Sequence, residues 1–243
     1  MKKILILLFA IAANCAYSQN TKTLNPTLGI SHDLSAEAEQ TLKVRDSLND
    51  ENYNGKLDEK QKQRLDSLYE IYPETRSSIW DVIGDGADWT DYGGPFAVRA
   101  SSSLKPSNGI IYEATNTKDL RLETAWVEGA KGNGEGEFLE YYFKNDSPRV
   151  TKAIIINGYV KTPELWAANN RVKDLDLYIN GEFYAKLQLK DVQAEQIFEL
   201  PTLGRREDGK DLILTFVIKS VYPGTKYNDT AITEIYFQGM DVY

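Results

Sequence analysis

The stretch DLDLYINGEFYAKLQL, residues 174–189, decides the fold class of this chain of 243 residues. Apolar and polar side chains alternate on both sides of Asn180 and Gly181. Alternation with a period of two is typical of a strand with one buried face, and both Asn and Gly tolerate the positive φ of a two-residue turn. The sequence therefore predicts a β-hairpin over residues 172–189 that turns at this pair.

Strand patterns recur on both sides of this hairpin. Residues 153–156 are apolar on both faces, as in a central strand that is covered on both sides. No helical pattern of the length found in βαβ units separates the strand segments, so a parallel sheet is disfavoured. The sequence predicts a mainly β domain over residues 77–243, an antiparallel jelly-roll β-sandwich. Its further strands are expected at residues 137–143, 152–160, 195–200, 212–219 and 231–237.

The segment before the sandwich, residues 34–73, carries helical patterns. A first helix is predicted from Ser35 to about Leu48. A second helix begins near Asp58, because Asp58 and Gln61 have the spacing of a capping box, in which each side chain binds the backbone N–H of the other residue. The two helices are short and closely connected, so the sequence predicts a helical hairpin in front of the sandwich.

The first residues have the order of a secretory signal peptide. Lys2 and Lys3 precede an apolar run that is too short to span a bilayer. Small side chains at Ala16 and Ser18 predict that residues 1–18 are removed by cleavage after Ser18. We expect an exported protein, periplasmic or secreted, whose mature chain begins with a polar, flexible leader over residues 19–33.

Cys15 is the only cysteine, and a lipoprotein would carry its lipid there. Asn14 stands directly before it, where a lipoprotein signal normally has a small residue. Lipid anchoring at Cys15 is therefore the less favoured alternative. Cleavage after Ser18 would leave neither a disulfide nor a reactive thiolate in the mature chain.

The charge balance disfavours nucleic acid as a partner. The chain has 28 basic and 36 acidic residues, a net charge of −8. Removal of residues 1–18 takes away two lysines and no acid, which leaves 26 basic residues against 36 acidic ones and a net charge of −10. Such an excess of acid repels phosphate backbones, and no stripe of Lys and Arg offsets it. No transmembrane segment is expected in the mature chain, and the oligomeric state stays open.

The composition also argues against histidine-dependent catalysis. The only histidine, His32, lies in the polar leader, so a Ser/His/Asp or Cys/His site would have to be built on a flexible segment. A carboxylate pair of the glycosidase type stays open, because such a pair is defined by separation in space. The glycine-rich run at residues 129–136 lacks the Lys-Ser/Thr end of a phosphate-binding loop and is interpreted as a plain loop.

The connection between the two helices resembles a calcium-binding loop. Asp50, Asn52, Asn54 and Asp58 stand at positions one, three, five and nine of that motif. Gln61 stands at position twelve, where a bidentate glutamate is needed, and it is equally explained as the partner of the Asp58 cap. The plain helical hairpin is favoured, with this loop as a weak candidate for calcium.

Aromatic side chains in or beside predicted loops are candidates for ligand binding, because their faces can stack on sugar rings. Next to them in the sequence, Asn169 and Arg171 add amide and guanidinium donors for sugar hydroxyls. The alternative is that Asn169 and Arg171 brace the loop before the strand at Val172, and that the aromatic side chains pack in the core. The six candidates are Trp89, Tyr92, Tyr159, Trp166, Asn169 and Arg171.

The second half of the chain carries motifs that resemble one domain family. They are TAWVEG at residues 124–129, NGYVK at 157–161, RVK at 171–173, YPGTKY at 222–227, and single residues Asn116, Asp119, Asn169, Glu234 and Ile235. Together they resemble the discoidin-type module described as the translocation domain of NAD-glycohydrolase toxins, one of the galactose-binding-like sandwiches of coagulation factors V and VIII. The resemblance covers residues 77–243. It implies a jelly roll with a non-catalytic role, often carbohydrate or cell-surface binding, and does not imply NAD cleavage.

A structural calcium ion in the sandwich is a further expectation. Asp119 and Thr124 lie on the loop before the strand at Trp126, and the alternation of the last strand turns Glu234 away from its apolar neighbours. A buried acid needs a partner. In related galactose-binding-like sandwiches a metal joins the first loop to the final strand, which supports Ca²⁺ at Asp119, Thr124 and Glu234 with backbone carbonyls from the same loop. The alternative is a metal-free hydrogen-bond network.

These observations predict an exported, non-catalytic binding module that recognises a glycan or a cell-envelope component through loops at one end of the sandwich. Two alternatives stay open: a small carboxylate-type glycosidase, and a protein-interaction or assembly module. The glycosidase needs two acids that flank a cleft, whereas binding needs only an aromatic platform.

Overall fold

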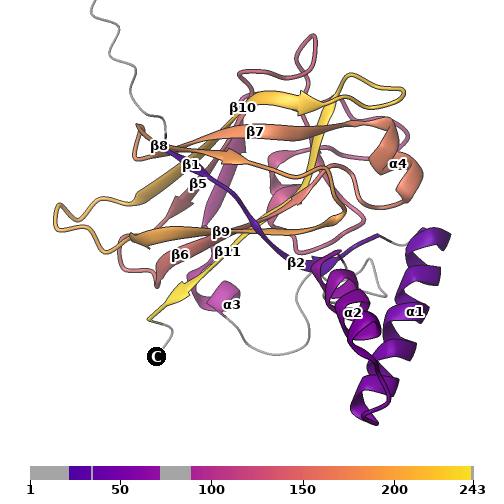
Figure 1. Cartoon of the computed structure of the whole chain (residues 1–243). Coiled ribbons are helices and arrows are strands. Elements are labelled where there is room, and N and C mark those ends of the chain that lie inside the picture. Colours follow the sequence, from indigo (N-terminus) through magenta and orange to yellow (C-terminus); the bar gives the residue numbers. More distant parts are fainter. Residues whose placement is uncertain (1–21, 34, 72–88, 242–243) are drawn as a thin grey trace, which may run out of the picture.

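Two layers of β-strands pack face to face in the body of the protein (Figure 1). The computed structural model describes residues 22–33, 35–71 and 89–241. One layer has the order β1-β8-β7-β10-β5-β3, and the other has the order β2-β9-β6-β11 with β4 beside β11. The strands are β1 (Thr23–Leu24), β2 (Thr27–Ser31), β3 (Ala97–Ala100), β4 (Trp126–Val127), β5 (Phe138–Phe143), β6 (Arg149–Asn157), β7 (Asn170–Ile179), β8 (Glu182–Gln188), β9 (Ala194–Leu203), β10 (Leu212–Tyr222) and β11 (Thr230–Met240).

The predicted β-hairpin and jelly-roll sandwich are confirmed. β7 and β8 pair antiparallel and turn at Asn180 and Gly181, whose φ angles are 52° and 85°. β6 ends at Asn157, before its expected end at residue 160, because Gly158 has a φ of 84° that interrupts the extended backbone. The pairing is not wholly antiparallel: β11 meets β7 in parallel, as β1 meets β8.

A buried aromatic cluster joins the two layers. The ring of Phe237 meets those of Tyr141 and Phe143 edge-on, with centroids 5.1 Å and 4.9 Å away, and Phe216 lies 6.3 Å from it. All four side chains are almost fully buried. Edge-to-face pairs contribute about 0.5–1.5 kcal/mol beyond the area that they bury, so the strands form a rigid support for the loops at their ends.

Residues 22–33 are not the flexible leader that their polar composition predicted. They form a strap along the edges of both layers: β1 pairs with β8 and β2 pairs with β9, with Thr27 opposite Ile197. The backbone N–H of His32 donates to the carbonyl of Gln193 at 2.7 Å, and the His32 side chain is buried. Backbone hydrogen bonds to unpaired sheet edges hold the strap, and polar side chains do not prevent them.

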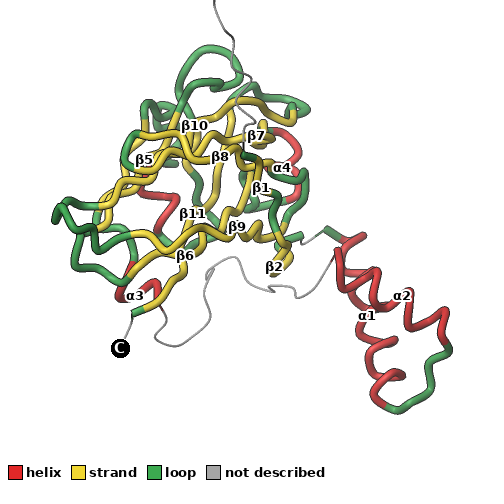
Figure 2. The backbone as a smooth tube through the Cα atoms, turned by 60° about the vertical axis from the view of Figure 1, so that its left-hand side comes forward, coloured by secondary structure: helices red, strands yellow, loops and turns green. Residues whose placement is uncertain are grey.

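The predicted helical hairpin is present as α1 (Ala36–Tyr53) and α2 (Glu59–Ile71), beside the sandwich (Figure 2). Its capping box is confirmed: Asp58 Oδ1 accepts from the Gln61 N–H at 2.8 Å, and Gln61 Oε1 accepts from the Asp58 N–H at 2.9 Å. α1 continues past its expected end at Leu48. Three short helices complete the described chain, namely α3 (Trp89–Gly93), η1 (Ala114–Lys118) and α4 (Pro163–Ala168).

The predicted signal peptide, including Cys15, lies outside the described residues. Within the part of the chain that the structure covers, no helix combines the length and the apolar character needed to cross a membrane.

Candidate functional site

Several connections between strands gather at one end of the sandwich, which we call the loop end. Strand pairing brings them together: Asn170 at the start of β7 lies beside Thr230 at the start of β11, and Ile156 near the end of β6 lies opposite Glu195 near the start of β9. The loop end comprises residues 103–113, 119–125, 158–169, 190–193 and 223–229.

Arg171 joins three of these loops. Its Nε and one terminal nitrogen donate to the two carboxylate oxygens of Asp191 at 3.0 Å and 2.9 Å. Its other terminal nitrogen donates to the carbonyls of Asn169 at 3.0 Å and Pro223 at 3.2 Å. The side chain is only 8% exposed. A bidentate pair with two further hydrogen bonds leaves Arg171 little capacity for a ligand, which favours the bracing role over the sugar-binding role.

The indole of Trp166 lies on the Arg171 guanidinium, with 4.5 Å between the guanidinium carbon and the ring centroid. Its Nε1 donates to the carbonyl of Asn157 at 3.0 Å. Between them, Gly158 leaves no room for a larger residue, because a Cβ there would lie 2.6 Å from Arg171 Cγ and 2.7 Å from Trp166 Cδ1. Asn169 is buried, and its Nδ2 donates to the carbonyl of Leu165 within α4. This group is a rigid brace behind the loop end.

Two hollows open at the loop end beside this brace. One of about 240 Å³ is lined by three tyrosines, Tyr112, Tyr159 and Tyr227, together with Asn169. The other, of about 390 Å³, is lined by Tyr159 and by the exposed pair Ile110 and Ile111. Tyr159 is itself buried, with its hydroxyl donating to the Glu123 carbonyl at 3.3 Å, and burial raises its pKa. The exposed aromatic side chain of the hollows is therefore Tyr227, which the sequence analysis did not single out as a ligand contact.

The three residues expected to hold calcium do come together. The Thr124 hydroxyl donates to both carboxylate oxygens of Asp119, at 3.0 Å and 2.8 Å. The backbone N–H of Arg121 is shared between Asp119 Oδ1 at 3.0 Å and Glu234 Oε1 at 3.2 Å. Leu120, between them in the chain, has a φ of 61°, so the loop is tightly turned toward the last strand.

Glu234 is fully buried, and among the described residues its Oε2 has no hydrogen-bond partner. Burial first, and then the carboxyl group of Asp119, raise the pKa of Glu234 well above its ordinary value. A second buried glutamate, Glu128, differs: its two oxygens accept from the backbone N–H groups of Ala130 at 2.7 Å and Thr230 at 3.3 Å. The pair of Asp119 and Glu234 therefore suits a cation, whereas Glu128 is satisfied by the backbone.

Across the described ranges, no group of three or more His, Cys, Asp or Glu side chains is placed to hold a metal ion. A cation at Asp119 and Glu234 would need Thr124 and backbone carbonyls for the rest of its oxygen shell, which Ca²⁺ accepts.

The sandwich and its loop end match the model of one domain family. The model of the NAD glycohydrolase translocation F5/8 type C domain matches residues 89–238, more than half of the chain. The chain belongs to this family. The predicted resemblance is thereby confirmed, and F5/8 type C domains of this kind are typically non-catalytic binding modules.

No curated protein matches the F5/8 type C chain. Among solved structures, the CBM32-1 and CBM32-2 domains of Clostridium perfringens ZmpB in complex with GalNAc align with a TM-score of 0.45 at 14% identity, covering 86% of this chain and 50% of that one. Arabinofuranosyltransferase AftD from Mycobacteria aligns with a TM-score of 0.43 at 15% identity, over 62% of this chain and 11% of that one. CBM32-3 from a family 31 glycoside hydrolase from Clostridium perfringens has a TM-score of 0.41 at 11% identity, covering 62% of this chain and 97% of that one. The chain spans half the length of the first of these.

The six predicted ligand contacts of this F5/8 type C domain do not form one surface. Trp89 is buried, and its Nε1 donates to the carbonyl of Met240 at 3.2 Å. Tyr92, in α3, is 59% exposed. Both belong to the far end of β11, whose eleven residues extend about 33 Å at 3.3 Å per residue. Tyr159, Trp166, Asn169 and Arg171 lie at the loop end instead, so the expected set is divided between the two ends.

The calcium-like loop between the helices also differs from its prediction. Asp50 and Asn52 belong to the last turn of α1, so the connection contains only residues 54–58. Asn54 Nδ2 donates to the carbonyl of Asp50 at 2.7 Å, and the Asp58 carboxylate caps α2. The side chains of Asn54 and Asp58 therefore serve the ends of the helices, and helical hydrogen bonding extends α1 through the first part of the expected loop.

Proposed function

We propose that this protein is an exported, non-catalytic binding module that recognises a glycan or a cell-envelope component through the loop end. The observation that carries the proposal is the tyrosine-lined hollow of about 240 Å³ held in place by the Arg171 brace. The Tyr227 side chain is 39% exposed, and Asn169 lines the same hollow. Aromatic faces with nearby polar groups match the apolar faces and hydroxyls of sugars.

Export is part of this proposal. It rests on the sequence of residues 1–18, with its basic start, apolar run and small residues before the expected cleavage point at Ser18. A periplasmic or secreted location would bring the loop end into contact with surface glycans. Mass spectrometry of the N-terminus of the exported protein is the test, because a first residue of Gln19 supports cleavage and a lipid on Cys15 contradicts it.

Binding is tested with a glycan array on the full chain, followed by an assay for released reducing sugar. We expect at least one glycan to bind and none to be cleaved. Tyr227→Ala should weaken binding, and Tyr92→Ala is the matched control, because Tyr92 is an exposed tyrosine at the opposite end. Sugar release would support the carboxylate glycosidase instead. Absence of any glycan ligand would overturn glycan recognition and direct the search to protein partners.

We also propose that Asp119, Thr124 and Glu234 hold a structural calcium ion. The unpartnered Oε2 of buried Glu234 and the adjacent Asp119 carboxylate support it. The ion would connect the loop before β4 to β11 and take no part in chemistry. A ligand that binds only the folded state stabilises it by about 2.7 kcal/mol at a hundredfold excess over its dissociation constant.

The prediction is a higher melting temperature in calcium than in chelator for the parent protein. Asp119→Ala should lose this difference, whereas Glu207→Ala, at an exposed acid of the β9–β10 connection, should keep it. Elemental analysis provides the second measurement. A parent protein that contains no calcium and melts identically in both conditions contradicts the proposal.

A further inference from the structure

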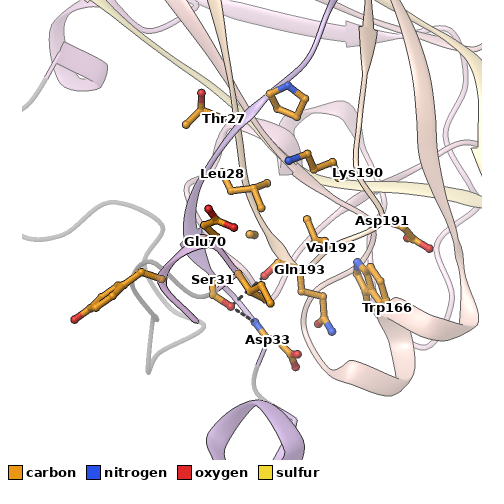
Figure 3. Close-up of a pocket in the computed structure, with 14 residues that line it drawn as sticks. Thr27, Leu28, Ser31, Asp33, Glu70, Trp166, Lys190, Asp191, Val192 and Gln193 are labelled. Atoms are coloured by element: carbon orange, nitrogen blue, oxygen red, sulfur yellow. Dashed lines mark hydrogen bonds between the residues drawn. The ribbon is translucent and has the colours of Figure 1, made fainter. Parts of the chain in front are cut away.

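A hollow of about 740 Å³ lies between the strap, α2 and the β8–β9 connection (Figure 3). We call it the strap cleft. Ser31 and Asp33 come from the strap, Glu70 from α2, Gln193 from the connection and Trp166 from α4. Small-ligand sites have volumes of about 300–1,000 Å³, so the strap cleft has the size of a binding site.

The strap cleft is separate from the tyrosine-lined hollow at the loop end. Trp166 lines the strap cleft. No residue lines both the strap cleft and the tyrosine-lined hollow. The strap and α2 also lie outside residues 89–238, the part that the family model matches. Two of its walls are therefore additions of this chain to the F5/8 type C sandwich.

Trp166 presents a rigid apolar surface to the strap cleft. Its indole is fixed by the Arg171 guanidinium at 4.5 Å and by the hydrogen bond from Nε1 to Asn157. The side chain is half-buried, unlike those of Trp89 and Trp126, which are buried. A fixed aromatic ring loses little side-chain entropy when a sugar ring packs on it.

Gln193 carries the polar feature that points to a ligand. Its side-chain oxygen is buried and, among the described residues, accepts no hydrogen bond. An unsatisfied buried acceptor is unfavourable, and a hydrogen bond from a ligand hydroxyl would relieve that cost. The Ser31 hydroxyl lies beside it, donating to the Gln193 carbonyl at 3.5 Å and accepting from the Asp33 N–H at 3.3 Å. In Figure 3, Ser31 and Asp33 of the strap lie next to Gln193 of the β8–β9 connection.

The charges of the lining select against acidic ligands. Asp191 is paired with Arg171, so its charge is neutralised. The lining also carries the carboxyl groups of Asp33 and Glu70 and one lysine, Lys190. An excess of carboxylates in a partly closed site repels anions and favours neutral or cationic groups.

We infer that the strap cleft binds an uncharged or amine-bearing oligosaccharide, with about two sugar rings between Trp166 and Gln193. The inference rests on the proposed function in one respect, that the module recognises glycans. It differs in placing a site beside the strap and α2, where Trp166 and Gln193 rather than the loop-end tyrosines supply the main contacts.

The test begins with an array of neutral, amine-bearing and acidic oligosaccharides on the full chain, and the tightest neutral or amine-bearing one is titrated calorimetrically. Gln193→Leu should weaken its binding about tenfold, equivalent to 1.4 kcal/mol. The same variant should be no less stable than the parent, because it removes an unsatisfied amide oxygen. Gln188→Leu, an exposed glutamine at the end of β8 outside the cleft, is the control and should match the parent.

A second variant, Val192→Phe, fills the strap cleft from its β8–β9 wall and should also weaken binding. If both variants bind like the parent while Tyr227→Ala loses binding, the strap cleft is wrong and the loop-end site stands. If the variants lose binding and Tyr227→Ala does not, the strap cleft is supported as the glycan site. Binding of acidic oligosaccharides alone would overturn the cleft inference, and an array without any ligand would overturn glycan recognition at both sites.

Discussion

The sandwich and the helical hairpin bury apolar side chains on very different scales. In the sandwich, Phe237 is fully buried in a cluster that joins both layers, and its partners come from strands far apart in the sequence. The hairpin has a small cluster of Leu48, Leu57 and Leu65, drawn from two neighbouring helices and the connection between them. Tyr53 at its tip is 92% exposed.

The difference indicates two levels of stability in one chain. A core of long-range contacts unfolds as a unit, whereas a short helical hairpin with few buried side chains opens at lower free energy. This bears on function, because α2 supplies one wall of the strap cleft while the strap, α4 and the β8–β9 connection supply the others. Opening of the hairpin would enlarge the cleft without disturbing the loop end.

The largest effect is expected at the centre of the sandwich. Phe237→Ala should lower the free energy of unfolding by about 3–5 kcal/mol, because it leaves a cavity among three aromatic rings. Urea unfolding followed by tryptophan fluorescence measures it. Phe183→Ala, at a 42% exposed position of β8, is the control and should cost under about 1 kcal/mol. Equal costs for the two variants would contradict the assigned core.

A smaller and local effect is expected in the hairpin. Leu65→Ala should lower the free energy of unfolding of the hairpin by about 2 kcal/mol. The melting temperature of the helices, measured by far-ultraviolet circular dichroism, should fall. The transition of the sandwich, followed by tryptophan fluorescence, should not move. Lys62→Ala, on the exposed side of α2, controls for helix propensity. A common shift of both transitions would show that the hairpin and the sandwich unfold together, and would contradict two separate levels of stability.

The smallest effect tests a turn of the sandwich that has no packing role. Gly181 has a φ of 85°, and no heavy atom lies within 4 Å of the position of an added Cβ. Gly181→Val should therefore cost about 1 kcal/mol or more from backbone strain alone. Thermal unfolding measures this, with Glu182→Val at the next, exposed position as control. A melting temperature equal to that of the parent would mean that the turn adopts another conformation.

Local patterns in the sequence were sufficient for much of the fold. The turn at Asn180 and Gly181 follows from the conformational preferences of those two residues, and the capping box of Asp58 and Gln61 follows from their spacing. The strands of the sandwich follow from the alternation of apolar and polar residues, although their observed ends differ from the predicted ones. Each of these signals acts over a few residues, so the sequence carries it without knowledge of the partner strand.

The strap and the roles of the site residues were decided only by tertiary structure. Residues 23–24 and 27–31 become strands because β8 and β9 leave edges for them to pair with, and their own side chains give little sign of it. The sequence left open whether Arg171 contacts a ligand or braces a loop. Its hydrogen bonds to Asp191 and Pro223, which lie in loops distant in the sequence, decided for the brace. Trp89 and Trp166 are both loop-side tryptophans in the sequence, yet the length of β11 separates them. Hydrogen-bond partners and separations of this kind depend on how far-apart segments are placed, and no local pattern specifies that.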